Sequence, residues 1–397
     1  MPPKYVITDF DIMPDSSELQ TQKIQSVFDM CKDSGGTVVI PKGEYHTGAL
    51  RMWSNTTLIL EDGSRLVGSD ICENYEIFDI PDNIEMRSDM EMITSYFGKP
   101  WSAYRRAIIT VYGGKNIRII GCGNAVIDGS DCCDPNGEEG FRGPHGIFIS
   151  SVEKAELAGY TICNCGNFMH EINNSTDIHI SGVTCLGGSD GVHMHESKNI
   201  LIENCTFHTG DDCIAGINMK DLTVRNCDLN TSCDIFRAGG NNILIENCHM
   251  WGPGIFPHRM SVVQNRGTEL VRDKRNTLPQ TEGRHNLIFV WVHFASEKYS
   301  AQKPYGNIIF RNCLIENPEA FMEYDPEAII QKGAYISDIK LENVEIRNVK
   351  RLSGLHPTKE HPMLAEIINC SVTTSDGNKT DTPFRKGTEW LRQKISE

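Results

Sequence analysis

The sequence predicts an all-β protein, a single right-handed parallel β-helix over residues 1–397 with an N-terminal capping helix. Three observations lead to this prediction. A pattern about one coil long recurs along the chain, its segments alternate with the period of a β-strand, and Asn and Cys return at fixed positions within it. Stacked coils account for all three, since each coil satisfies the backbone of its neighbours while alternate side chains fill the interior.

Each recurring segment begins with a polar residue, often Asn or Asp, continues with a short run rich in Ile, Leu and Val, and ends in a turn. Segments starting at 154, 177, 199, 221 and 242 follow one another at intervals of 23, 22, 22 and 21 residues. This interval is too short for a helix–turn–helix repeat, and the LxxLxL pattern of leucine-rich repeats is absent. It suits a coil of three short strands. Four clear segments are DIHISGVTC at 177–185, NILIENCTF at 199–207, DLTVRNCDL at 221–229 and NILIENCHM at 242–250.

The turn after each apolar run carries Asn and then Cys. The asparagines are Asn204, Asn226 and Asn247, and each is followed directly by Cys205, Cys227 or Cys248. We expect an internal ladder of Asn side chains that hydrogen-bond turn backbones, beside small buried thiols. Single cysteines one coil apart lack the paired spacing of zinc ligands, so these positions predict no metal site.

Three segments lie outside the repeat. Residues 18–31 predict an amphipathic helix that caps the first coil, with Ser16 or Ser17 as its N-cap and Leu19 on its apolar face. Residues 251–304 break the repeat and are rich in Arg and Lys, which predicts an irregular basic insertion. This insertion either shapes a pocket for a carboxylated ligand or forms a solvated loop. Residues 377–397 are polar and predict a peripheral tail.

The composition narrows the class of partner. A formal net charge of −15 argues against nucleic acid and anionic membranes, and suits an acidic substrate only if positive charge gathers at the site. No secretory signal is visible, and no run approaches the roughly 18 apolar residues of a membrane span. Fifteen cysteines, an odd number in a long chain, favour reduced, buried thiols in a cytoplasmic protein over disulfides. No cofactor is expected.

Three aspartates point to the chemistry. Asp190 stands in Ser-Asp-Gly, Asp211 and Asp212 stand in Gly-Asp-Asp-Cys, and the interval from Asp190 to Asp211 is 21 residues, about one coil. We therefore expect three carboxylates side by side. Close like charges push their pKa values apart, and glycoside hydrolysis needs one acid for the leaving oxygen and another carboxylate for the water. The alternatives are turn aspartates that accept backbone N–H bonds, or a calcium site, although no DxDxDG loop is present.

The chain resembles glycoside hydrolase family 28, the polygalacturonase and rhamnogalacturonase group of parallel β-helix enzymes. The resemblance covers most of the chain, including the stretch through residue 69 and the Ile127-Asp128-Gly129 turn. The family's Asn-Thr-Asp-Gly appears as Gly188-Ser189-Asp190-Gly191, and its Asp-Asp motif is intact as Gly210-Asp211-Asp212-Cys213. The resemblance implies that Asp211 is the general acid. It implies that Asp190 and Asp212 position and deprotonate the attacking water, with inversion at the anomeric carbon.

Two family motifs are missing. Ser232-Cys233-Asp234 stands where the family has Gly-His-Gly with its histidine near the general acid, and the Arg-Ile-Lys that grips the substrate carboxylate has no counterpart. His193 or His208 could replace the histidine in space, or Asp234 or Arg237 could support the acid differently. Arg266 lies at about the distance expected for the clamp, with Arg237, Arg259 and Arg284 as further candidates. The candidate substrate-binding residues are His193, His208, Asp234, Arg237 and Arg266, and no metal ligand is predicted.

The leading functional hypothesis is an inverting, exo-acting hydrolase of a pectin-type or related oligosaccharide. The exo mode is inferred because imported fragments are short and the segment 251–304 could close one end of a cleft. A second hypothesis is a β-helix polysaccharide lyase or uronate epimerase, which needs a base and charge neutralisation by Arg, Lys or Ca²⁺. A third is a non-catalytic carbohydrate-binding β-helix, which the two missing motifs leave open.

Overall fold

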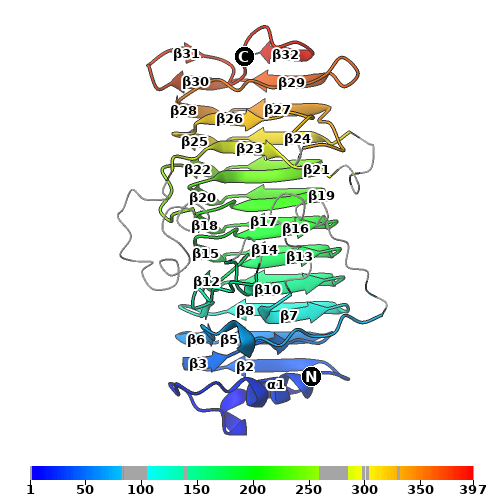
Figure 1. Cartoon of the computed structure of the whole chain (residues 1–397), viewed down its shortest axis with the longest axis vertical. Coiled ribbons are helices and arrows are strands. Elements are labelled where there is room, and N and C mark those ends of the chain that lie inside the picture. The colour runs from blue at the N-terminus through cyan, green and yellow to red at the C-terminus, as the bar shows by residue number, and fades with distance from the viewer. Residues whose placement is uncertain are drawn as a thin grey trace.

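The computed structural model describes residues 2–82, 84, 105–137, 141–258, 285–296, 300, 304–328 and 331–396. These residues form a tall stack of coils that rises from the N-terminal end to the C-terminal end (Figure 1). Successive strands pair in parallel, as β14, β17, β19 and β21 do, whereas the short β31 pairs antiparallel with β30. The predicted right-handed parallel β-helix is confirmed.

Two sheets run along the described part of the stack. Sheet A has 20 strands: β1 (Lys4–Val6), β2 (Gly36–Ile40), β4 (Leu50–Arg51), β5 (Thr56–Leu60), β7 (Ala107–Tyr112), β8 (Lys115–Gly121), β10 (His145–Ser150), β11 (Glu153–Ala158), β13 (His170–Asn173), β14 (Thr176–Ser181), β16 (Val192–His195), β17 (Lys198–Glu203), β19 (Ile214–Arg225), β21 (Asp234–Glu246), β23 (Phe289–His293), β24 (Gly306–Arg311), β26 (Ala320–Glu323), β27 (Asp338–Glu342), β29 (Met363–Ile368) and β32 (Leu391–Ser396). Sheet B has 12 strands: β3 (Gly43–Thr47), β6 (Ser64–Gly68), β9 (Val126–Asp128), β12 (Thr161–Cys163), β15 (Thr184–Gly187), β18 (Thr206–Thr209), β20 (Asp228–Thr231), β22 (His249–Trp251), β25 (Leu314–Glu316), β28 (Glu345–Val349), β30 (Ser371–Thr374) and β31 (Lys379–Thr380).

The core consists of apolar columns that the strand register creates. Ile178 of β14 is paired with Ile200 of β17, Ile200 with Leu222 of β19, and Leu222 with Ile243 of β21. All four side chains are buried in one continuous cluster. Because each such side chain contributes about 1.5–3 kcal/mol when fully buried, the period-two repeat fixes the register of every coil on its neighbours.

The asparagine ladder exists, but it lies outside the coil rather than inside it. Asn204, Asn226 and Asn247 are exposed and adopt left-handed backbone angles, with φ of 54°, 53° and 53°. Their side chains bond one another: Asn226 Nδ2 donates to Asn204 Oδ1 at 3.4 Å, and Asn247 Nδ2 donates to Asn226 Oδ1 at 3.3 Å. The prediction of an internal ladder is therefore wrong. The next residue, such as Cys205, already fills the interior, so the Asn side chain points to solvent.

None of the fifteen cysteines forms a disulfide, and ten of them are buried. The thiol of Cys205 donates to the carbonyl of Glu203 at 3.2 Å, and Cys227 bonds Arg225 in the same way at 3.2 Å. The predicted buried thiols are thus present, and each lies in the interior directly after the turn Asn in the sequence. Within the described residues, no helix combines the length and the apolar character needed to span a membrane.

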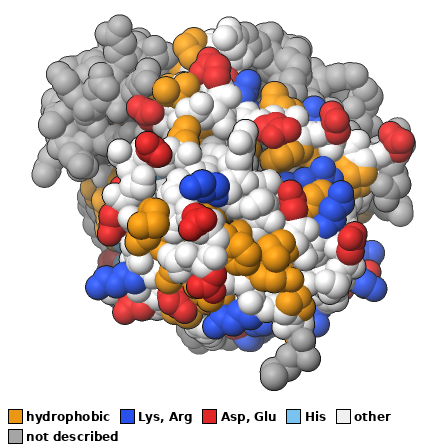
Figure 2. Space-filling model, turned by 90° about the horizontal axis from the view of Figure 1, so that it is seen from below, with side chains coloured by type: hydrophobic (Ala, Val, Ile, Leu, Met, Phe, Trp, Pro, Cys, Tyr) orange, Lys and Arg blue, Asp and Glu red, His pale blue; other side chains and the backbone are white. Residues whose placement is uncertain are grey.

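A helix lies at the N-terminal end of the stack, where the range 18–31 predicted one (Figure 1). It is α1 (Thr21–Asp29); the short helix η1 (Ile7–Phe10) precedes it in the chain, and the short helix η2 (Cys72–Asn74) follows β6. Ile24, Val27 and Phe28 join the main core, but Leu19 is exposed. The N-cap is Gln20 without a side-chain cap bond, so the assignment of Ser16 or Ser17 is wrong. Figure 2 shows this end of the molecule, with charged and apolar side chains interspersed over it.

Two segments are more regular than the sequence suggested. Within 251–304, β23 pairs with β21 and β26 and is therefore an ordinary coil strand, because its run Phe-Val-Trp-Val-His is buried throughout. Residues 259–284, 297–299 and 301–303, which hold most of the basic side chains, lie outside the described residues. The segment 377–397 is not merely peripheral, since β32 pairs with β29 and adds a strand to sheet A.

Candidate active site

The three aspartates lie in consecutive turns that lead from sheet B into sheet A. Asp190 lies between β15 and β16, and Asp211 and Asp212 lie between β18 and β19. Backbone bonds hold these turns in register: Gly191 N donates to Asp212 O at 3.0 Å, and Cys213 N donates to Asp234 O at 3.1 Å. Because the coils repeat one above the other, residues at equivalent turn positions share one edge of the stack.

The structure brings together the three carboxylates that the sequence singled out. One oxygen from each of Asp190, Asp211 and Asp212 lies within 4.8 Å of the others. The three residues are 0%, 6% and 1% exposed. Such a cluster cannot hold three full negative charges at neutral pH without compensation, so protons or cations must be distributed among the carboxylates.

Asp211 is the carboxylate with cationic neighbours. Arg142 Nη2 donates to Asp211 Oδ2 at 2.8 Å, and His258 Nε2 lies 3.6 Å from Asp211 Oδ1. Burial alone would raise the pKa of Asp211, but His258, Arg142 and Arg237 together lower it well below its ordinary value. Asp211 is therefore ionised in the resting protein.

The pKa values of Asp190 and Asp212 are shifted upward, opposite to that of Asp211. Burial, with Asp211 and Asp212 nearby, raises the pKa of Asp190 well above its ordinary value, and its Oδ2 bonds His193 Nδ1 at 2.7 Å. Burial also raises the pKa of Asp212 to about 6, against the opposing charge of Arg237. Arg237 Nε lies 2.7 Å from Asp212 Oδ2 without the alignment of a hydrogen bond. The cluster thus combines one carboxyl that favours the protonated form, Asp190, with one that is ionised, Asp211.

His258 was not identified from the sequence. Its segment packs on the aspartate turns: Ser232 Oγ donates to Phe256 O at 2.6 Å, and any side chain at Gly210 would collide with the carbonyl of Pro257. Burial lowers the pKa of His258, but Asp211 raises it by more, so that the net shift is upward. His258 therefore lies beside Asp211, where the sequence suggested His193 or His208, although no repeat position signals it.

Arg142 was also missed, but a signal for it existed. It lies just before β10, in the same kind of sheet B to sheet A turn that carries Asp190 in a later coil. Its guanidinium carbon is 5.4 Å from the ring centroid of Phe168 and 5.7 Å from that of Phe141. Counting coils backward from Asp190 would have brought this turn to the same edge of the stack.

The five predicted substrate-binding residues differ in whether the structure places them beside the aspartates. His193 and Arg237 contact Asp190 and Asp212 directly. Asp234 lies in the next turn, where its Oδ1 accepts from Phe289 N at 3.2 Å. His208 instead bonds Asp228 Oδ1 at 2.9 Å. Arg266, like the further candidates Arg259 and Arg284, lies outside the described residues.

His208 is thus not brought to the aspartates. Its strand β18 belongs to sheet B, and the ring of Trp251 lies edge-on to the His208 ring at 5.9 Å. His208 therefore does not replace the family histidine beside Asp211, because the side chains of β18 alternate between the core and the outer face of sheet B.

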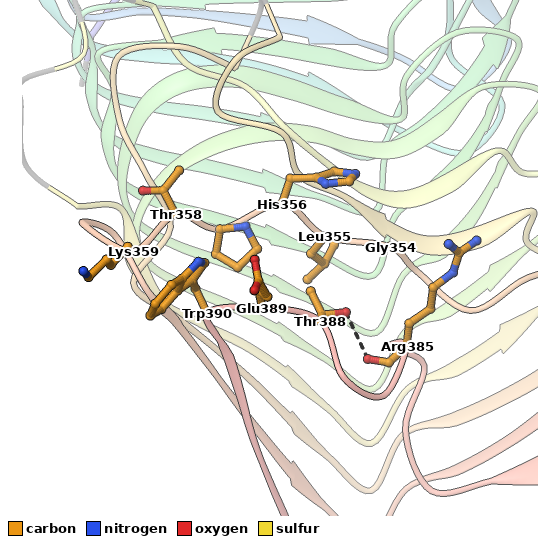
Figure 3. A pocket seen from close by; sticks show the side chains of 10 residues that line it. Gly354, Leu355, His356, Thr358, Lys359, Arg385, Thr388, Glu389 and Trp390 are labelled. Carbon is orange, nitrogen blue, oxygen red and sulfur yellow. Dashed lines mark hydrogen bonds between the residues drawn. The ribbon is translucent and has the colours of Figure 1, made fainter.

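A pocket lies apart from the aspartates, at the C-terminal end of the chain (Figure 3). Its volume is about 530 Å³, and Arg385, Trp390 and His356 are among the side chains that line it. Thr388 Oγ1 donates to the Arg385 carbonyl at 3.1 Å, the bond drawn in Figure 3. These three lining side chains are exposed, whereas the aspartates are buried among charged partners. The aspartate cluster is therefore the candidate active site.

Comparison with protein families gives a match to the model described as glycosyl hydrolases family 28, over residues 81–233. A segment of 129 residues is 33% identical to the exo-poly-alpha-D-galacturonosidase of Dickeya chrysanthemi. That segment is 32% of this chain and 20% of the relative, so it spans about a fifth of the relative's length. The resemblance inferred from Asp190 and Asp211-Asp212 is confirmed over the stretch that holds them.

Solved structures share the fold. A hyperthermoactive exopolygalacturonase from Thermotoga maritima superposes with a TM-score of 0.68 at 14% identity, over 94% of this chain and 87% of that one. PfbA, a surface adhesin of Streptococcus pneumoniae, superposes with a TM-score of 0.52 at 12% identity, over 99% of this chain and 90% of that one. At these identities the likeness concerns the fold alone, and the same architecture serves both proteins.

Proposed function

Because residues 81–233 match glycoside hydrolase family 28, we propose that this protein is a polygalacturonase-like glycosidase, inverting and exo-acting on a pectin-type or related oligosaccharide. The observation that carries the proposal is the group Asp190, Asp211 and Asp212, whose oxygens approach within 4.8 Å while their pKa values are pushed in opposite directions. Acid–base hydrolysis needs neighbouring carboxyls in different protonation states.

The proton for the leaving oxygen is proposed to come from Asp211 and His258 acting together. The family resemblance implies Asp211 as the donor, yet its lowered pKa leaves it ionised in the resting state. His258, whose pKa is raised, holds a proton 3.6 Å away. Transfer from His258 Nε2 to Asp211, and from Asp211 to the glycosidic oxygen, makes the pair the acid. Geometry in the absence of substrate is often looser than in the reacting complex.

Asp190, which keeps its proton, is proposed to hold the attacking water, and Asp212, whose pKa of about 6 leaves it ionised at neutral pH, to deprotonate it. Inversion is proposed from the family resemblance. The carboxylate oxygens lie within 4.8 Å, whereas the two carboxyl groups of inverting glycosidases are typically about 6.5–9.5 Å apart and those of retaining enzymes about 5–5.5 Å.

An acidic sugar is the proposed substrate class. Arg142 and Arg237 concentrate positive charge at the aspartates of a chain whose net charge is −15. An exo mode is proposed by analogy with the relatives, which are named as exo-acting enzymes. Action in the cytoplasm is proposed as well, and fifteen cysteines without a disulfide support it because disulfides are rare there.

The proposal is tested by a reducing-end assay on pectic oligosaccharides, with NMR of the first-formed anomer. We expect release of terminal sugars with inverted configuration, and loss of turnover with retained binding in Asp211→Asn. A retained anomer would contradict inversion, and cleavage in the middle of long chains would contradict the exo mode.

Two other outcomes would replace hydrolysis altogether. An unsaturated product that absorbs in the near ultraviolet would identify a lyase. Binding without turnover on a broad glycan panel, by both the wild type and Asp211→Asn, would favour a carbohydrate-binding protein. The second outcome merits a test because an adhesin shares this fold.

A further inference from the structure

Beside the aspartates lies a second group of side chains with different chemistry. Glu171 of β13 and His193 and His195 of β16 present one carboxylate oxygen and two imidazole nitrogens, all within 4.8 Å of one another. All three residues are buried. None of the three is needed for the acid–base step proposed above, apart from the contact of His193 with Asp190.

The strand register explains why these side chains meet. His193 and His195 are two residues apart on β16, so both side chains project from the same face of sheet A. Glu171 is paired with His193 across the ladder, and Asn173 is paired with His195. Neighbouring strands are about 4.8 Å apart, which sets the spacing of the resulting square of side chains. The imidazole rings of His193 and His195 have centroids 4.7 Å apart.

Outer partners orient two of the three candidate ligands. Asp190 Oδ2 bonds Nδ1 of His193 at 2.7 Å, so Nε2 is the nitrogen through which His193 would bind an ion. Asn173 Nδ2 donates to Glu171 Oε1 at 2.9 Å and orients that carboxylate. The ring of Phe168 stacks on His193 at 4.2 Å and fixes its plane. A carboxylate behind a histidine and an amide behind a carboxylate are the usual second layer of a metal site.

We propose that Glu171, His193 and His195 bind one divalent transition-metal ion. Two histidines and one carboxylate, with positions left open for water or substrate, suit Zn²⁺ and Fe²⁺ better than Ca²⁺ or Mg²⁺, which prefer oxygen ligands. A tetrahedral Zn²⁺ site with bonds of about 2.0–2.2 Å would draw the donor atoms closer together than they stand now.

The electrostatics agree with this geometry. His193 is 0% exposed, and burial favours the neutral imidazole that binds a metal. Arg142 and Arg237 are each already paired with an aspartate of the catalytic group. Through His193 the ion would lie one hydrogen-bonded residue from Asp190 and would favour ionisation of that carboxyl.

The test measures metal binding and needs no turnover, so its failure would leave the proposed function untouched. Protein freed of metal with a chelator is titrated with Zn²⁺ by calorimetry, and Co²⁺ is added separately to record its visible absorption. We expect one Zn²⁺ per chain and a Co²⁺ spectrum of His and carboxylate coordination. Absence of stoichiometric Zn²⁺ uptake by the wild type would overturn the proposal.

Variants locate the site. His195→Gln and Glu171→Gln should abolish the stoichiometric binding, and Asn173→Ala should weaken it by about 10–100-fold. The matched control is His249→Gln, because His249 also contacts two carboxylates, Asp228 at 3.1 Å and Glu316 at 2.9 Å, but on the outer face of sheet B. Uptake that survives in His195→Gln, or that disappears in His249→Gln, would overturn the assignment. Circular dichroism checks that each variant is folded, and the Co²⁺ spectrum of the wild type needs no variant.

Discussion

At the scale of single residues, the site depends on three buried carboxyls whose neighbours shift their pKa values in different directions. Asp211 faces Arg142 and His258 and is ionised, whereas Asp190 faces a neutral histidine, His193, and keeps its proton. The same burial would raise the pKa of all three, so the difference comes from the two cations on one side of the cluster.

His258 is the residue whose replacement tests this arrangement most directly. His258→Gln keeps a hydrogen-bonding side chain but removes the proton, so we expect kcat to fall by about 10²-fold or more. The loss of activity that the wild type shows as pH rises through the raised pKa of His258 should disappear in the variant. A pH series of kcat and KM measures both effects. His208→Gln, which alters a histidine bonded to Asp228 instead, should change neither, and an unaltered pH profile in His258→Gln would contradict the proposed acid.

The contact between His258 and Asp211 should also stabilise the folded protein in a way that depends on pH. The pKa of His258 is raised above its ordinary value of 6.5, so its stabilising effect is fully present below that pH and is lost as pH rises through the folded pKa. Wild type should therefore exceed His258→Gln in free energy of unfolding at about pH 6, and the gap should narrow as the pH is raised to about 8.5. Denaturant unfolding at the two pH values measures it, and a gap that widens with pH would show that the sign is wrong.

The ion pair of Arg142 with Asp211 should be worth far more than a surface pair. Arg142→Met leaves a buried carboxylate with one cation fewer and should cost about 3–5 kcal/mol of unfolding free energy. Arg118→Met removes an exposed ion pair with Glu156 and should cost at most about 1 kcal/mol. Thermal unfolding compares the two. Adding Asp211→Asn to Arg142→Met should restore part of the loss, and equal losses in the two single variants would contradict the buried pair.

At the scale of the element, each coil turns at an asparagine in the left-handed backbone region. That conformation costs an ordinary residue roughly 1–2 kcal/mol, and Asn tolerates it better than most. The side chain then bonds the Asn of the next coil, so one residue both permits the turn and ties it to its neighbours.

Asn226 lies in the middle of this ladder and separates the two contributions. Asn226→Gly keeps the backbone freedom and loses only the side-chain bonds, whereas Asn226→Ala loses both. We expect Asn226→Ala to be the more destabilised, by roughly 1–2 kcal/mol relative to Asn226→Gly. Urea denaturation measures the difference. Equal stability of the two variants would mean that the turn conformation carries no cost.

At the scale of the whole molecule, a net charge of −15 must be reconciled with an acidic sugar. Like charges slow the approach of a polyanion, and salt screens them over a Debye length of about 10 Å at 0.1 M. We expect KM for an oligouronate to fall as NaCl is raised, while KM for a neutral aryl glycoside stays constant. Steady-state kinetics over a salt series measures both values. A KM for the oligouronate that rises with salt would show that the arginines at the site outweigh the global charge.

The sequence by itself determined the architecture and the aspartates, because a coil of fixed length converts spacing along the chain into neighbourhood in space. Asp190 and Asp211, 21 residues apart, had to lie in adjacent turns once the repeat was recognised. The outward direction of the Asn ladder was misjudged because alternation around a turn depends on a backbone angle that composition does not reveal.

Only the tertiary structure decided what surrounds those aspartates. His258 comes from the segment where the repeat breaks, and it reaches Asp211 because Gly210 lets the carbonyl of Pro257 approach the turn. Arg142 comes from an earlier coil, and the group of Glu171, His193 and His195 depends on the register of β13 on β16. The contact of His258 with Asp211 joins residues that the coil period does not relate, since it depends on packing between segments.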